Sequence, residues 1–240
     1  MLISRALLVA GARRWSRSDL AVAGAFGGTL AVMNVSFYES FSRIPLGIAV
    51  TIEFLGPLGV AVAFSRRWLD LLWVSLAAAG IVLLTRDDSG SVTALGVGFA
   101  LLAAAAWAGY ILLSTATGRR FPASSGLALA SVAATVLVLP LGVRTGGADL
   151  IRPDVLLVGA AVGLLSSVIP YTFEIEALRR MPARVFGILM SLEPVAAALV
   201  GLVVLGEVLD AREWLAIGCV VVACLGAMRS QAAPPEAPEV

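Results

Sequence analysis

The chain is divided into apolar runs, most of them about as long as a lipid bilayer is thick. A helix needs about 20 mostly apolar residues to cross the hydrocarbon core. Eight candidate runs follow in order: Leu20–Ser42, Leu46–Phe64, Leu69–Leu84, Val92–Thr115, Ser124–Val143, Val155–Leu178, Val185–Leu205 and Trp214–Met228. The sequence therefore predicts an all-α integral membrane protein with about eight helices spanning the lipid bilayer.

The composition excludes several other classes of protein. Hydrophobic residues make up 60% of the 240 positions, whereas a soluble domain is about half apolar. Histidine is absent, which removes the usual zinc, serine-histidine and cysteine-histidine sites. Cys219 and Cys224 have neither zinc-ligand spacing nor a disulfide framework. We therefore expect no metal, no cofactor and no enzymatic activity. A nucleic-acid partner is not expected either, although the net charge of +1 does not bear on this.

The loops between the runs carry arginine unequally. One alternate set of loops contains eleven arginines: Arg13, Arg14, Arg17, Arg66, Arg67, Arg119, Arg120, Arg179, Arg180, Arg184 and Arg229. The other set contains five: Arg43, Arg86, Arg144, Arg152 and Arg212. Because cytoplasmic loops are enriched in arginine and lysine, this distribution predicts a multi-pass protein with its C-terminus in the cytoplasm.

The two ends of the chain differ from the rest. The apolar segment Met1–Ala12 is too short to span and is followed by arginines, which is the wrong charge order for a signal peptide. We expect residues 1–12 to be the stub of a truncated membrane helix. The polar, proline-rich residues 229–240 are expected to form a disordered cytoplasmic tail.

Two segments 137 positions apart resemble each other, FYESFSRIPLGIAVTIEFLGP from Phe37 and EIEALRRMPARVFGILMSLEP from Glu174. The matched pairs are Glu39 and Glu176, Arg43 and Arg180, Pro45 and Pro182, and Pro57 and Pro194. The segments lie an odd number of runs apart, so they cross the membrane in opposite directions. Such an inverted repeat is typical of secondary transporters. We assign residues 13–85 to a first repeat with three spanning helices and residues 92–228 to a second with five.

Each copy contains a helix interrupted by proline, at Gly56-Pro57 and at Pro194, with a glutamate nearby. Interrupted helices at matching positions commonly mark a transport site near the midplane. Glu53 and Glu193 lie well inside their runs, where a charge costs about 2.5–3.5 kcal/mol on insertion scales. Either glutamate could bind an amine or exchange a proton. Alternatively, each could be a protonated side chain hydrogen-bonded to backbone groups that the proline leaves free.

Other polar and aromatic side chains are candidates for lining the cavity: Asn34, Tyr38, Trp107, Tyr110, Tyr171 and Glu174. Ordinary hydrogen bonding between helices, or packing, is the alternative for each of them. We interpret Glu39–Arg43 and Glu176–Arg180 as structural ion pairs, because their spacing places them on one helix face. The pairs Gly24/Gly28 and Gly159/Gly163 predict close approach between helices.

The stretches SFYESFSRIPLGIAVTIEFLGPLGVAV, AAAWAGYILLS and RVFGILMSLEPVAAALVGLVVLGE resemble the EamA-type branch of the drug/metabolite transporter superfamily. Within that branch they are most similar to the threonine/homoserine exporters of bacterial inner membranes. The resemblance implies a ten-helix fold of two inverted five-helix units around a cavity. It also implies that the chain lacks the first helix and about half of the second.

The resemblance places Glu53, Gly56 and Pro57 in the first half of the site, and Glu193 and Pro194 in the second. It implies export of small metabolites, such as threonine and homoserine, across the bacterial inner membrane by alternating access. Coupling to protons and exchange of solutes both stay open, as does the oligomeric state. The alternatives are an exporter of drugs or other metabolites with the same fold, or a truncated membrane protein that does not transport.

Overall fold

The computed structural model describes residues 15–64, 68–85, 92–121, 125–170, 173, 176, 180 and 189–231. The expected stub at 1–12 and most of the expected tail lie outside this part of the chain. In the order of the chain, the elements are α2 (Arg17–Phe41), α3 (Leu46–Glu53), α4 (Leu55–Ala63), α5 (Leu69–Thr85), α6 (Ala94–Arg120), α7 (Ser125–Gly146), η1 (Gly147–Ile151), α8 (Pro153–Gly163), η2 (Leu164–Val168), α11 (Glu193–Val200), η3 (Gly201–Leu205) and α12 (Ala211–Gln231). The described residues form helices and turns and contain no strand, as the sequence predicts.

The helices follow the apolar runs closely. Within the described residues, five segments are long and apolar enough to cross a membrane: Arg17–Phe41, Leu46–Ala63, Ala94–Arg120, Ser125–Ile151 and Ala211–Arg229. Three shorter apolar helices are Leu71–Leu83, Pro153–Ser166 and Glu193–Leu205. Each of the eight overlaps one run of the sequence, and parts of the expected runs 155–178 and 185–205 lie outside the described residues. The number of helices that cross the membrane stays a prediction.

Local hydrogen bonds explain where some helices begin. At the start of α2, Asp19 N–H donates to Ser16 Oγ and Ser16 N–H donates to Asp19 Oδ2, both at 3.1 Å. At the start of α12, Asp210 and Glu213 exchange the same pair of bonds at 2.7 Å. These capping boxes satisfy amide groups that have no partner within the helix. The turn-and-charge signals between the runs are therefore also the signals that start helices.

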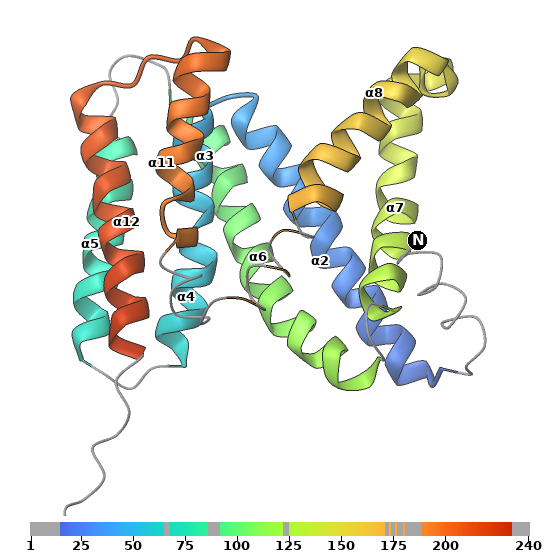
Figure 1. Ribbon diagram of the computed structural model, residues 1–240, viewed down its shortest axis with the longest axis horizontal. Coiled ribbons are helices and arrows are strands. Elements are labelled where there is room, and N and C mark those ends of the chain that lie inside the picture. The colour runs from blue at the N-terminus through green and yellow to red at the C-terminus, as the bar shows by residue number, and fades with distance from the viewer. Residues whose placement is uncertain are drawn as a thin grey trace, which may run out of the picture.

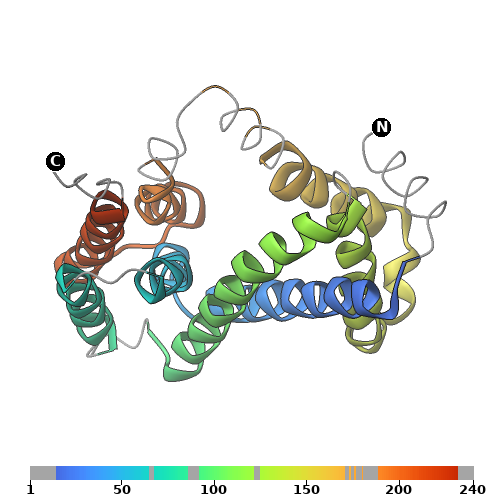
Figure 2. The same ribbon diagram turned by 90° about the horizontal axis from the view of Figure 1, so that it is seen from below.

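The helices pack in two groups joined by α6 (Figures 1 and 2). On one side, α2 packs against α6 and α7; on the other, α5 packs against α12 and α3 packs against α11. The helices α3 and α4 also pack on α6. Large apolar side chains remain exposed on α7 and α8, for example Val136 at 62% and Leu157 at 73%. An exposed apolar surface of this extent is what a bilayer would cover.

Close contacts between helices occur at glycines, but not at those the GxxxG pattern predicts. Among the described atoms, none lies within 4 Å of a Cβ built on Gly24, Gly159 or Gly163, so close approach at these three stays a prediction. Instead, Gly47 faces the backbone of Ala198 on α11, and Gly56 faces the backbone of Ala104 on α6. Glycine spacing identifies a helix face that could pack closely, and the partner helix determines whether it does.

Candidate functional site

The first interruption separates α3 from α4 and lies at Phe54. The sequence places the break at Gly56-Pro57, and the structure places it three residues earlier. The reason is that Pro57 has no N–H to donate to the carbonyl of Glu53, four residues before it. Proline is tolerated in the first turn of the following helix, where α4 holds it. Gly56 lies within α4, where its missing side chain lets the helix contact α6.

The second interruption precedes α11 and has the same construction. Leu189 and Met190 are helical, Ser191 and Leu192 form a turn, and α11 begins at Glu193. Pro194 occupies the first turn of α11, so Met190 lacks the amide donor that would continue the helix. Ser191 is fully buried, and its hydroxyl donates to Met228 Sδ of α12 at 3.3 Å.

These two interruptions bring Glu53 and Glu193 together. The helix α3 runs beside α11 in the opposite direction, in contact through Gly47 and Ala198. Glu53 is the last residue of α3 and Glu193 the first of α11, so both lie at the same end of the pair. Their carboxylates are close enough to interact electrostatically. Glu53 is half-buried and Glu193 is exposed.

The two carboxylates occupy different positions relative to their helices. Glu193 stands at the N-terminus of α11, where free amide groups and the helix dipole favour a negative charge. Glu53 stands at the C-terminus of α3, where the dipole disfavours it. The pair can therefore attract a cation, and of the two positions the C-terminus of α3 at Glu53 is the less favourable for a negative charge.

The aromatic stripe of α6 is divided between two environments. The Trp107 ring meets the Phe54 ring edge-on, with centroids 5.0 Å apart, so Trp107 lies at the first interruption. The Tyr110 ring contacts Phe26 of α2 at 5.2 Å and packs with Leu30. Trp107 therefore packs on Phe54, the residue that follows Glu53, whereas Tyr110 packs against α2.

The remaining candidates lie elsewhere or outside the described residues. Asn34 donates its amide to Leu30 O at 2.9 Å and lines an apolar hollow of about 390 Å³ between α2 and α7. Tyr38 is half exposed, with its ring 5.3 Å from that of Phe41. Tyr171 and Glu174 fall in the part of the chain the structure does not describe. A cavity role for these four residues stays a prediction.

Two ion pairs agree with their structural interpretation. Glu39 contacts Arg43 at 2.5 Å, and Glu176 contacts Arg180 at 2.6 Å. A further acidic residue, Glu207, was not singled out by its spacing, although its carboxylate accepts the N–H of Leu46 at 2.9 Å. Across the described residues, no group of three or more Cys, Asp or Glu side chains could hold a metal ion.

Comparison with known proteins agrees with this architecture. Residues 94–229 match the profile of the EamA-like transporter family. The chain belongs to the EamA-like transporter family. It is 42% identical over 206 residues to the threonine/homoserine exporter RhtA of Escherichia coli (strain K12), covering 84% of this chain and 68% of that protein. The identity and coverage are the same for RhtA of Salmonella typhimurium (strain LT2).

A more distant relative is the uncharacterized transporter YwfM of Bacillus subtilis, 31% identical over 165 residues, which are 68% of this chain and 55% of that protein. The resemblance seen in the sequence is therefore confirmed. Membership of this family also makes the chain a membrane transporter of small molecules rather than an enzyme.

Proposed function

We propose that this EamA-like transporter exports small amino acids of the threonine and homoserine type across a bacterial inner membrane. The observation that carries the proposal is the 42% identity to threonine/homoserine exporters over 84% of the chain. An identity of this extent covers the α3, α6 and α11 regions that meet around the acidic pair. Export would proceed by alternating access, driven by protons or by exchange.

The acidic pair is the proposed binding site for the amino group of the cargo. An ammonium group between Glu53 and Glu193 would relieve the repulsion of the two carboxylates. This gain exists only when cargo is bound, so it favours the cargo-bound transporter. Trp107 would form an apolar wall beside it through its contact with Phe54. Glu53, at the less favourable position for charge, is the better candidate for taking up a proton when the cargo leaves.

An inverted repeat is the proposed architecture, with residues 13–85 in the first unit and 92–228 in the second. It is supported by the positions of the two interruptions, since Phe54 and Ser191 are 137 residues apart, the same offset as Pro57 and Pro194. Matching breaks at one offset are expected of two copies of the same unit. A ten-helix arrangement would need helices in addition to the eight apolar helices found in the described residues.

The proposed orientation has the C-terminus in the cytoplasm. Arg120 at the end of α6 contacts Ser18 at 2.7 Å and Asp19 at 3.5 Å, so α2 begins and α6 ends on the same side. The Leu46–Glu207 hydrogen bond joins two loops on the opposite side. This pairing of ends agrees with the alternation of arginine-rich loops, which supports a cytoplasmic location for the first set.

The proposal is tested with radiolabelled threonine in proteoliposomes containing the full chain. We expect Glu53→Gln and Glu193→Gln each to lower uptake at least about tenfold, because each removes one charge from the ammonium site. Glu39→Gln is the matched control, since that glutamate pairs with Arg43 away from the interruptions. If the wild-type protein transports another solute but neither threonine nor homoserine, the proposed cargo is refuted.

A further inference from the structure

The end of η3 is built to hold the side chain of Glu207 in one place. Gly206 adopts a left-handed conformation with φ of 71°, which ends the helix and turns the chain back. Glu207 N–H then donates to Gly201 O at 3.0 Å. The Glu207 carboxylate lies over Gly201, where even a Cβ would overlap Oε2. Both glycines are therefore needed for this side-chain position.

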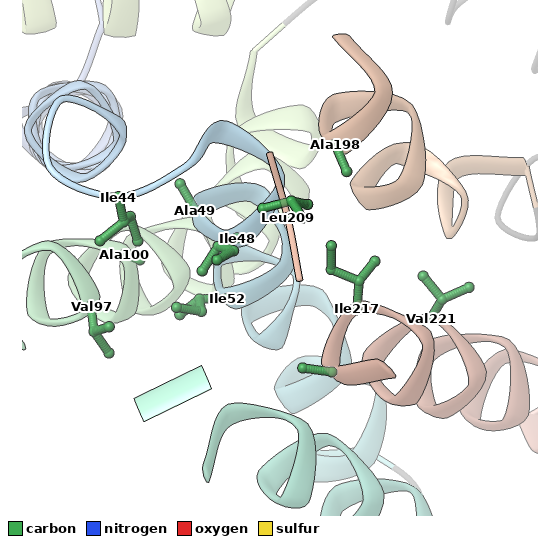
Figure 3. Packing of buried hydrophobic residues seen from close by; sticks show 11 residues of the cluster. Ile44, Ile48, Ala49, Ile52, Val97, Ala100, Ala198, Leu209, Ile217 and Val221 are labelled. Atoms are coloured by element: carbon green, nitrogen blue, oxygen red, sulfur yellow. The ribbon is translucent and has the colours of Figure 1, made fainter. Parts of the chain in front are cut away.

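The carboxylate placed in this way caps the start of α3, 161 residues earlier in the chain. Pro45 precedes α3 and supplies no side-chain cap. Leu46 N–H instead donates to Glu207 Oε2 at 2.9 Å, and the negative charge lies at the favourable end of the helix dipole. The neighbouring Leu209 is buried with Ile48 and Ala198 in one cluster, as Figure 3 shows. The loop after η3 is thus attached to α3 by a hydrogen bond and by buried apolar contacts.

We propose that Glu207 is a positioning residue of the transport site, which fixes α3 on α11 so that Glu53 faces Glu193. This inference rests on the proposed function. The helices α3 and α11 run in opposite directions. The Glu207–Leu46 hydrogen bond therefore lies at one end of this pair, and Glu53 and Glu193 lie at the other. The distance along α3 is about 12 Å for eight residues. Because α3 is bounded by Pro45 and by the break at Phe54, it can shift as a unit once its cap is lost.

The cap is removed with Glu207→Met, which keeps a long side chain but has no oxygen acceptor. Glu207→Gln is the conservative variant, since its amide oxygen can still accept from Leu46. Threonine binding to purified protein is measured together with hydrogen–deuterium exchange of the peptide 46–53. We expect Glu207→Met to weaken threonine binding about tenfold, because fewer molecules hold the binding-competent arrangement. Exchange in the peptide should be faster by a similar factor, and Glu207→Gln should stay close to wild type in both measurements.

A second variant disturbs the position of the Glu207 carboxylate by changing Gly201, over which it lies. Gly201→Ala leaves Glu207 intact but occupies the space of its carboxylate. Combining it with Glu207→Met should add nothing to the effect of Glu207→Met alone, because both changes break one contact. The control is Glu39→Met, the same replacement at a glutamate that pairs with Arg43.

Unchanged exchange and binding in Glu207→Met, or effects of Gly201→Ala and Glu207→Met that simply add, would overturn the positioning role. If Glu207→Met accumulates too poorly to purify, Gly201→Ala and Glu207→Gln decide between the same outcomes. Wild-type protein that does not bind threonine would refute the proposed cargo instead. The exchange comparison needs no cargo, so it still tests whether Glu207 holds the start of α3 in place.

Discussion

The contact between Gly47 and Ala198 determines how closely α3 approaches α11, and Gly47→Ala tests it directly. A Cβ on residue 47 would lie 2.5 Å from Ala198 Cβ and 2.6 Å from Ala198 Cα. Carbon atoms ordinarily rest about 3.5–4.0 Å apart, so the helices must separate by about 1 Å. That separation would propagate to the other end of the pair, where Glu53 and Glu193 interact.

The magnitude follows from two opposing effects. Replacing glycine by alanine within a helix favours folding by about 1 kcal/mol, and overpacking opposes it by about 1–3 kcal/mol. The matched control is Gly59→Ala on α4, since a Cβ there meets no described atom within 4 Å. Both variants replace a helical glycine by alanine, so their free energies of unfolding should differ mainly by the overpacking at residue 47, about 1–3 kcal/mol. Denaturation with SDS in mixed micelles measures this difference.

The second readout is threonine transport in proteoliposomes, which should fall in Gly47→Ala and stay unchanged in Gly59→Ala. Adding Ala198→Gly removes the Cβ overlap but leaves the contact of 2.6 Å to the Cα of residue 198. The double variant should therefore recover only part of the lost stability. Gly47→Ala protein as stable and active as Gly59→Ala protein would refute the close packing of α3 on α11.

Three further predictions concern other parts of the molecule. Glu53→Gln should lower the maximal transport rate more than it raises KM, whereas Glu193→Gln should mainly raise KM, which initial rates over a range of threonine concentrations measure. Trp107→Ala should lower the free energy of unfolding by about 3 kcal/mol, because it removes the ring that packs on Phe54; Trp107→Phe should lose less. Ser16→Ala should lower it by about 1 kcal/mol through the lost cap of α2 and leave transport unchanged.

Each of these has an outcome that would contradict it. Identical kinetic changes in the two glutamate variants would show that their different positions at the helix ends do not matter. Full stability of Trp107→Ala would mean that the contact with Phe54 contributes nothing, and reduced transport by well-folded Ser16→Ala would extend the site to the start of α2. Membrane abundance of each variant, measured by quantitative immunoblotting, provides the common control.

Much of the candidate site could be predicted from the sequence because its signals are local. The positions of both interruptions follow from prolines, to within three residues, because proline removes the amide that the carbonyl four residues earlier requires. The pairing of Glu39 with Arg43 follows from helical spacing. The sequence could not predict where Asn34 and Tyr38 lie relative to the acidic pair. That placement depends on which face of α2 packs against α6 and α7.

The sequence by itself therefore determined where the helices lie and where they break, since apolar length and missing amide donors act within a few residues. Only the tertiary structure decided that Gly47 rather than Gly24 is the close contact, and that Glu207 caps a helix 161 residues away. It also decided that Glu53 and Glu193 lie at the same end of the antiparallel pair α3 and α11. These features depend on the mutual approach of helices that are distant in the chain. That approach is set by how their side chains fit together, which neither hydrophobic length nor helical spacing encodes.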